Sequence, residues 1–598
     1  MKTDDKKGKF SPGQSPEEDA WYTSFFIENH LDYYAYPDHV ASPEQIRFMV
    51  QLEESEWYYP CSDRIFEAIM NKNQSAFIQK QYHKVLQRIM YLIKDQIEDQ
   101  KQRQYLESLI IIKFKHETRD ELMIPSRLEK RLLKILFHRT QISDPFLMEK
   151  TDKNRRAAAV LKSDMFLRAL NRFDTTEINS DNSTLKGIKE HVESLELKRL
   201  LSVMVERSLW EDEQAMRFAE EDFIRIMARK FIGNGVDELF KFLGILHNQP
   251  GTTESTKKIL WLMDESGEIM FDLAAIRYLT RIGHKIIIGF KSGPLYSKAE
   301  IRSAAYDLTL AGELEDAFLI KERDLSKNDL LKVLRNDSRI FIISDGTQEQ
   351  LNLLLTSTTF ARIFKEVDGI ISRGNDQKNV FFDTHFQFTQ NIFNITAEGK
   401  DSVAVSYKPR HQDFIKFSHK DLEKKAKIII DMMSDARGRG ETVIFYSGII
   451  GSIPGKIDIA KKIMSVFIEH LKEQTSQVFI INPSEYYEPG MDADDLMYMW
   501  EIVQRSGFID TWRFQTYNDI VEAFRLMETR VPPEWVGKDA TYSTGCTKEM
   551  AIALEVQEKY PEMQIIGPTK ERFMRRKDYG VGKMYDQRLG GEGVCYAC

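Results

Sequence analysis

The pattern of hydrophobic and polar positions divides the chain into three stretches. Over residues 21–248, apolar residues recur every three or four positions among Gln, Lys, Arg and Glu, which predicts a helical domain. Over residues 249–410, short apolar runs alternate with amphipathic segments, which predicts parallel strands joined by crossover helices. A shorter series of the same kind spans residues 411–580. The expected fold class is therefore α/β: a helical domain, a three-layer doubly wound Rossmann-like domain, and a second, smaller α/β unit.

Individual elements can be placed on this pattern. The larger α/β domain is expected to hold strands at 258–264, 285–291, 316–321, 339–345, 367–372 and 402–408, with helices at 268–281, 298–311 and 351–366. The smaller unit is expected to hold strands at 442–446, 478–482, 510–514 and 564–567, with helices at 457–473, 493–504 and 547–560. The polar ends, residues 1–20 and 581–598, are expected to be tails, the first of them disordered.

Composition narrows the classes of partner. With 42% hydrophobic and 29% charged residues the chain is ordinary globular material, and its net charge is -8. Nucleic acids and anionic membranes both call for a dominant basic surface, so neither is expected as a partner. Four cysteines in 598 residues do not make a disulfide framework, and a cytoplasmic location is expected. A small molecule is the expected partner, and the oligomeric state is left open.

Polar residues and glycines follow four of the predicted strands of the larger domain. They are Asp264, Glu265, Ser266 and Gly267 after the first strand, Lys291 and Gly293 after the second, Asp345 after the fourth, and Arg373, Gly374 and Asn375 after the fifth. Because the carboxyl ends of parallel strands meet in one crevice, we expect these residues to line a binding site.

The residue types in this crevice favour one chemistry. Carboxylate oxygens without nearby imidazoles or thiols suit Mg²⁺ or Mn²⁺. The cations of Lys291 and Arg373 suit a phosphate group, and glycines let backbone amides approach it. A metal, a phosphate cradle and a bound water together indicate hydrolysis of a phosphate ester.

The same residues carry a resemblance to a known family. Asp-Glu-Ser-Gly-Glu-Ile from Asp264, followed by Phe-Asp at 271–272, resembles the Asp-Asn-Ala-Gly-Glu-Ile-Val-Phe-Asp signature of the damage-control phosphatases, whose domain is also described as acidic-residue-methyltransferase-like. Lys-Ser-Gly-Pro from Lys291 is similar to that family's Lys-Gly-Gly-Pro. Val-Asp-Gly-Ile-Ile-Ser-Arg-Gly-Asn, at 367–375, resembles its Ala-Asp-Leu-Ile-Ile-Ser-Lys-Gly-Gln-Gly-Asn segment. Asp-Pro-Phe at 144–146 and Gly-Asn-x-x-Asp at 233–237 also resemble family elements, so the likeness runs from residue 144 to residue 408.

The resemblance implies a metal-binding phosphatase of small phosphorylated metabolites, such as sugar phosphates or damaged phospho-metabolites. By this likeness Asp264, Glu265 and Asp345 hold a divalent metal, Mn²⁺ or Mg²⁺ with Co²⁺ or Ni²⁺ as further options. The expected catalytic set consists of two carboxylates and two cations: Asp264, Asp345, Lys291 and Arg373. Phosphate would be held by Ser266, Gly267, Lys291, Gly293, Arg373, Gly374 and Asn375, with Asn234 and Asp237 as second-tier candidates. The chain departs from the family pattern at Glu265, where Asn is usual, and at Arg373, where Lys is usual.

Other interpretations stay open at this stage. Asp264 could cap the helix that follows it, Lys291 and Arg373 could be surface cations, and Asn234 and Asp237 could be a helix cap and a surface charge. The altered residues would also suit a non-catalytic metabolite sensor or assembly protein. A third option is carboxyl methyl transfer from S-adenosylmethionine, although no glycine-rich loop for that cofactor follows the first strand.

Overall fold

The structure is a computed structural model that describes residues 13, 15–53, 56–72, 74–173, 185–245, 256–453 and 455–578. The chain forms two compact units, which meet in sequence between Phe414 and Ile415. The predicted C-terminal tail, 581–598, lies outside the described residues, as does most of the predicted N-terminal tail. The fold class predicted from the sequence, α/β, is confirmed.

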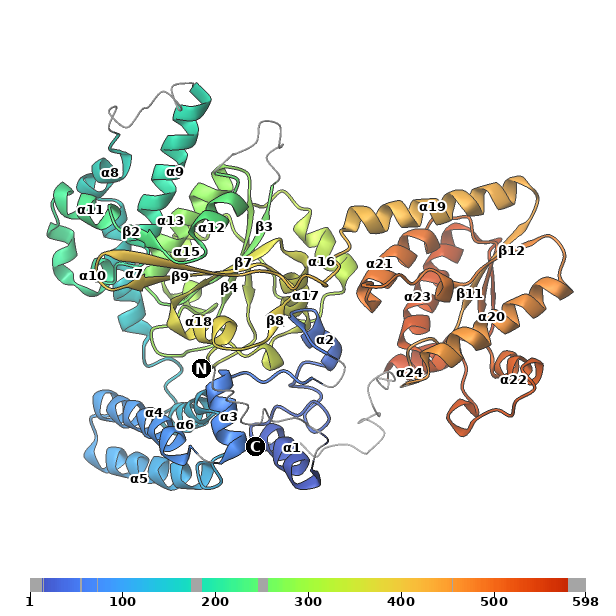
Figure 1. Ribbon diagram of the computed structural model, residues 1–598, viewed down its shortest axis with the longest axis horizontal. Coiled ribbons are helices and arrows are strands. Elements are labelled where there is room, and N and C mark those ends of the chain that lie inside the picture. The colour runs from blue at the N-terminus through green and yellow to red at the C-terminus, as the bar shows by residue number, and fades with distance from the viewer. Residues whose placement is uncertain are drawn as a thin grey trace, which may run out of the picture. The chain divides into compact units, whose positions relative to one another are not determined.

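The first unit is built on an eight-stranded sheet with the order β2-β10-β9-β7-β3-β4-β6-β5 (Figure 1). Its strands are β2 (Lys230–Ile232), β3 (Lys258–Leu262), β4 (Lys285–Phe290), β5 (Phe318–Leu319), β6 (Ile340–Ser344), β7 (Gly369–Arg373), β9 (Ile392–Glu398) and β10 (Ser402–Lys408). The five strands from β5 to β7, and β9 beside them, run parallel. Strand β10 runs antiparallel to β9, and β2 lies parallel to β10. A separate two-stranded ribbon pairs β1 (Val50–Gln51) with β8 (Gln387–Phe388).

Alternate residues of the central strands face two different helical layers. Leu260 and Leu262 of β3 pack in a core with helices from the first third of the chain and with three helices between residues 327 and 382. Ile259 and Trp261 face the opposite way, into a core with helices between residues 147 and 313. This period of two is what a sheet buried on both faces requires.

The helices of the first core are α1 (Pro16–Glu28), α2 (Pro43–Arg47), α3 (Asp63–Asn71), α4 (Ser75–Gln96), α5 (Gln100–Glu117), α6 (Pro125–Thr140), α16 (Lys327–Leu334), α17 (Thr358–Glu366) and α18 (Gly374–Phe382). Those on the other side are α7 (Leu147–Leu161), α8 (Asp164–Asn171), α9 (Leu185–Val203), α10 (Ser208–Glu211), α11 (Glu220–Met227), α12 (Val236–Phe242), α13 (Glu268–Arg281) and α15 (Leu308–Glu313), and the short α14 (Ser303–Tyr306) precedes α15.

This packing joins the two stretches that the sequence pattern separates. Residues of the predicted helical domain, 21–248, and of the predicted sheet domain, 249–410, lie in one compact unit and share both hydrophobic cores. Strand β2, which falls inside the helical stretch, even supplies an edge of the sheet. The helices need the faces of the sheet to bury their apolar stripes. The change near residue 248 from helical to alternating hydrophobic patterns therefore does not mark a domain boundary.

Two predicted helices of the first unit differ from the observed elements. The segment predicted as a helix at 298–311 begins as an extended strap and becomes helical only at α14 and α15. The helix expected at 351–366 begins later, at α17, where Ser357 accepts a hydrogen bond from the amide of Phe360 and so caps it.

The second unit holds a four-stranded parallel sheet in the order β12-β11-β13-β14. Its strands are β11 (Thr442–Ser447), β12 (Val478–Ile481), β13 (Thr511–Phe514) and β14 (Gln564–Ile566), each at a predicted position. Its helices are α19 (His419–Gly438), α20 (Ile457–Gln474), α21 (Ala493–Gln504), α22 (Tyr517–Leu526), α23 (Thr544–Lys559) and α24 (Lys570–Asp578). Within the described ranges, no helix combines the length and the apolar character that crossing a bilayer requires.

Candidate functional site

The residues predicted to follow β3, β4, β6 and β7 lie near the point where the order of the strands in the sheet reverses. Strand β3 has β4 on one side and β7 on the other, so the chain leaves β3 toward β4 and later returns to its opposite flank. Such a switch point opens a crevice at the carboxyl ends of the strands. Asp264 follows β3, and Arg373 and Gly374 close β7 and open α18, so both sides of the crevice carry predicted residues.

Asp264 is held between a lysine and the start of a helix. Asp264 as a whole residue is 7% exposed, and its Oδ1 accepts a hydrogen bond from Lys298 Nζ at 2.5 Å. Its Oδ2 lies against Gly374, the first residue of α18, so closely that a Cβ at position 374 would overlap it. Burial raises the pKa of Asp264, and the ammonium of Lys298 opposes that shift.

Lys298 stands among three carboxylates. Its Nζ lies 2.5 Å from Asp264 Oδ1, 3.0 Å from Asp376 Oδ2 and 3.9 Å from Glu265 Oε1. Its side chain is only 12% exposed. Burial would lower the pKa of Lys298, but the surrounding carboxylates, Asp264 first, outweigh it and raise that pKa, so the amine stays charged.

The other predicted carboxylate and cation form a second pair. Lys291 Nζ donates to Asp345 Oδ2 at 2.6 Å and to Thr347 Oγ1 at 3.1 Å. Both members are buried. Asp345 also accepts hydrogen bonds from the amide and the hydroxyl of Thr347, at 2.8 and 2.9 Å. The pair therefore bridges the ends of β4 and β6, which lie next to each other in the sheet.

Arg373 turns away from the crevice. It is fully buried, and its Nε donates to Asp272 Oδ1 at 3.0 Å while Nη2 contacts Glu268. Nη1 donates to the carbonyl of Ile395 at 2.9 Å, and Nη2 also donates to the carbonyl of Met204 at 2.8 Å. Burial raises the pKa of Glu268 to about 8, against the charge of Arg373. In this arrangement the guanidinium holds α13 to the sheet and presents no nitrogen to a phosphate.

The remaining predicted phosphate contacts have mixed placements. The amide of Gly267 donates to Asn154 Oδ1 at 2.5 Å, and Ser266 is buried with its amide bonded to the carbonyl of Ser297 at 2.7 Å. Gly267 needs to be glycine, because its φ is +85° and a Cβ there would overlap Trp210. Gly293 is buried beside Gln348, whereas Asn375 is exposed on the first turn of α18.

The second-tier candidates, Asn234 and Asp237, lie at the end of the sheet opposite to Asp264, where β7 and β9 begin. Asn234 exchanges two hydrogen bonds with the backbone of Tyr407, at 3.1 and 3.0 Å, near the end of β10. Since β10 runs antiparallel to β9, the end of β10 faces the start of β7. Asp237 is exposed in the first turn of α12. The structure therefore does not bring Asn234 and Asp237 together with Asp264.

The donor set does not fit a divalent ion in this arrangement. Asp264 and Asp345, the two aspartates predicted as ligands, are each joined to a lysine ammonium. Glu265 is joined to Arg207 at 2.7 Å. Across the part of the chain that the structure describes, no group of three or more His, Cys, Asp or Glu side chains is placed to hold a metal.

Three important residues of this region are not among those predicted from the sequence. Lys298 falls at the start of a stretch that reads as an amphipathic helix, so no pattern singles it out. Glu268 and Asp272 are four positions apart on α13, which places them on one helix face. That spacing, beside a buried arginine, is the signal that would have found them.

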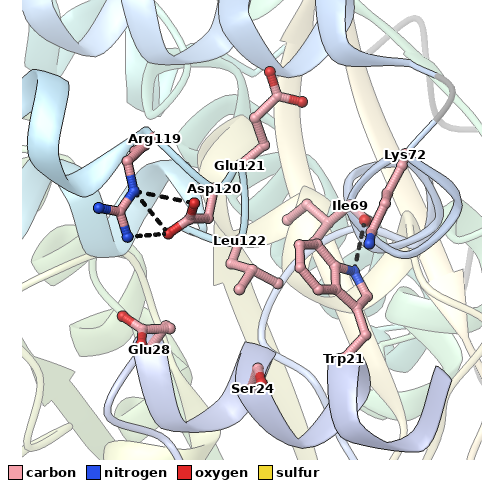
Figure 2. A pocket seen from close by; sticks show the side chains of 9 residues that line it. All are labelled: Trp21, Ser24, Glu28, Ile69, Lys72, Arg119, Asp120, Glu121 and Leu122. Atoms are coloured by element: carbon pink, nitrogen blue, oxygen red, sulfur yellow. Dashed lines mark hydrogen bonds and ion pairs between the residues drawn. The ribbon is translucent and has the colours of Figure 1, made fainter. Parts of the chain in front are cut away.

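A separate hollow lies among the N-terminal helices (Figure 2). It has a volume of about 480 Å³ and is lined by residues of α1, of α3 and the residue after it, and of the turn after α5, among them Trp21, Lys72 and Arg119. Arg119 pairs with its neighbour Asp120, and the Lys72 ammonium lies 3.6 Å from the centre of the Trp21 ring. None of the lining residues comes from the strand ends described above.

Comparison with known proteins links the first unit to one family. The sequence model of the damage-control phosphatase ARMT1-like domain matches residues 59–404, more than half of the chain. The match begins well before residue 144, so it includes helices that the motif likeness does not reach. No curated protein matches the chain. The crystal structure of a DUF89 family protein from Pyrococcus horikoshii covers 56% of this chain and 98% of its own, at 18% identity and a TM-score of 0.38.

Proposed function

Because the chain belongs to the damage-control phosphatase ARMT1-like family, we propose that it hydrolyses phosphate monoesters of small metabolites such as sugar phosphates or damaged phospho-metabolites. The observation that carries the proposal is the position of two buried ion pairs, Lys298–Asp264 and Lys291–Asp345, at the carboxyl ends of neighbouring strands beside the switch point of the sheet. Ligands of open α/β sheets bind at such points.

Two ammonium groups support binding of a phosphate. An ammonium has three N–H donors. Among the described residues, Lys291 uses two of them on Asp345 and Thr347, and Lys298 uses two on Asp264 and Asp376. Each lysine thus keeps one donor for a ligand oxygen. The first residue of α18 lies beside Asp264, and the positive end of that helix favours an anion.

Asp264 is suited to accept a proton. Its raised pKa makes it a stronger base than an ordinary aspartate. A water molecule would attack phosphorus, its proton would pass to Asp264 Oδ1 or Oδ2, and the ester oxygen would leave and take a proton from solvent. The family likeness implies a divalent ion, Mn²⁺ or Mg²⁺, as a further participant, but the charges described above do not fit one and no step is assigned to it.

The test is phosphate release by the full chain from a panel of sugar phosphates. Each substrate is assayed with a chelator and then with Mn²⁺, Mg²⁺, Co²⁺ or Ni²⁺. We expect turnover, and a loss of about 10²–10⁴-fold in Asp264→Asn, the usual contribution of a general base. Asp316→Asn, at an exposed aspartate paired with Arg277, is the control and should keep full activity. No release from any substrate under any condition would refute the proposal.

A second candidate is binding without turnover, as in a metabolite sensor. It is favoured by one observation, the neutralisation of each predicted metal ligand by a basic side chain. Calorimetric titration with the same sugar phosphates separates the two candidates. Heat of binding without release of phosphate supports a sensor, whereas release supports the enzyme.

A further inference from the structure

A strap of backbone fixes the position of Lys298. The amide of Ala299 donates to the carbonyl of Asp264 at 2.9 Å, and the amide of Lys291 donates to the carbonyl of Ala299 at 3.1 Å. Glu265 and Lys298 form an antiparallel bridge, and Lys291 and Glu300 form a parallel one. The residues around Lys298 therefore lie between the ends of β3 and β4 and are bonded to both. The backbone of Lys298 cannot move away from the strand ends without breaking these hydrogen bonds.

The ammonium lies where an ion held by these carboxylates would lie. Asp264 Oδ1 and Asp376 Oδ2 are both within hydrogen-bond distance of Nζ, and Glu265 Oε1 is the next oxygen out. A hard cation would draw on the same oxygens. It would also have to approach the positive charge of a lysine whose side chain is only 12% exposed.

We propose that Lys298 is the built-in cation of this site, so that the native chain does not take up a divalent ion at Asp264. The ammonium of Lys298, which is part of the polypeptide, provides the positive charge that stabilises these buried carboxylates. Removal of the ammonium leaves Asp264, Glu265 and Asp376 with an excess of negative charge in one place. The proposal therefore predicts that loss of Lys298 creates a metal site where the native chain has none.

The test measures Mn²⁺ bound by the full chain, by calorimetry and by the electron paramagnetic resonance of free Mn²⁺. The native chain is expected to bind no stoichiometric Mn²⁺ that depends on Asp264. Lys298→Ala is expected to bind one Mn²⁺ per chain at least tenfold more tightly, and Asp264→Asn in that background should abolish the gain. Lys332→Ala, at an exposed lysine 3.1 Å from Asp329, is the matched control and should gain nothing.

Two results would overturn the proposal. One is a single Mn²⁺ on the native chain that is lost in Asp264→Asn. The other is a folded Lys298→Ala, judged by circular dichroism, that gains no Mn²⁺. If Lys298→Ala does not fold, Lys298→Met retains the apolar stem without the charge and takes its place. Because the readout is bound metal and not phosphate release, the result stands apart from the test of hydrolysis.

Discussion

At the scale of single residues, the crevice depends on how tightly its charged groups are held. Asp264 has one oxygen on Lys298 and the other against the backbone of Gly374. Arg373 uses every nitrogen of its guanidinium inside the protein. Small changes at these positions should therefore have effects that chemically similar changes elsewhere do not.

Replacement of Gly374 by alanine should be costly because of Asp264. The φ of Gly374 is +74°, so any side chain costs roughly 1–2 kcal/mol, and the new Cβ would also overlap Asp264 Oδ2. Relief of that overlap should cost about 1–3 kcal/mol more. Gly399→Ala is the control, because Gly399 has a φ of +68° with open space around it. Urea denaturation should show a clearly larger loss of unfolding free energy for Gly374→Ala; equal losses would contradict the described packing.

Arg373→Lys should also destabilise the first unit, even though it preserves the charge. A lysine has one nitrogen and cannot reach Asp272, Glu268 and two carbonyls at once. A buried carboxylate left without its partner costs on the order of 3 kcal/mol. Arg281→Lys, where an exposed arginine pairs with Glu196, should change the stability by less than about 1 kcal/mol. Thermal unfolding measures the melting temperatures of the two variants. Equal melting temperatures would refute the stabilising role of the Arg373 guanidinium.

The residues at the strand ends show what one sequence can and cannot predict. The order of apolar runs predicts that Asp264, Lys291 and Asp345 lie at one end of the sheet, and the structure puts all three at the carboxyl ends of neighbouring strands. The orientation of Arg373 could not be predicted, because which face of β7 it occupies depends on one residue of register. The role of Lys298 depends on a strap whose backbone hydrogen bonds join β3 and β4, and no local pattern reports such contacts.

At the scale of elements, the strands of the second sheet could be predicted from their apolar runs, whereas strand β2 and helix α19 could not. Each strand of the second sheet lies within two residues of its predicted bounds. By contrast, β2 has three residues, of which only the middle one is partly buried. Its alternation of buried and exposed side chains is too short to recognise in the sequence. Helix α19 was hidden because its many lysines and aspartates give the look of a charged linker, although Leu422, Ala426, Ile429 and Met433 form a buried stripe.

Helix α23 carries a buried carboxyl that should make the second unit sensitive to pH. Burial raises the pKa of Glu549 from 4.5 to about 7, while Gln504 donates to its Oε1 at 3.0 Å. Between those two pH values the folded state holds a proton that the unfolded state has lost. Stability should therefore fall as pH rises from about 4.5 to about 7, by up to about 3 kcal/mol, and then level off.

Peptide-level hydrogen exchange of the full chain, corrected for intrinsic rates, measures this change at α23. Glu549→Gln should remove most of the pH dependence, since it stays neutral throughout. Glu555→Gln, at an exposed glutamate of the same helix paired with Arg505, should leave it in place. A pH dependence that persists in Glu549→Gln would assign the effect to another group.

Burial likewise raises the pKa of the nearby Cys546 thiol well above its usual value, which makes it a poor nucleophile.

At the scale of the whole molecule, the cores decide where the chain can be divided. The two cores of the first unit draw on helices from both predicted domains, and a further core lies entirely in the second unit. The hydrophobic pattern along the chain could not reveal these shared cores. It changes from helical to alternating near residue 248, while hydrophobic contacts join the residues on the two sides of that position.

Separate expression of fragments should follow the cores. Residues 1–414 and residues 415–598 should each fold and unfold cooperatively, since a cut after Phe414 leaves each core intact. Residues 1–248 should not, because their apolar helix faces lose the sheet that covers them. Calorimetry of the three fragments is the measurement. A cooperative transition in 1–248 would restore the helical stretch as an independent domain.

The strap that holds Lys298 also bears on how the protein would respond to its surroundings. A coordinated ion is exchanged with the solution, so its site can be emptied by scarcity or filled by a wrong element. An amine at the end of a side chain is made with the polypeptide and stays with it. A site built in this way would work unchanged through metal starvation or metal excess.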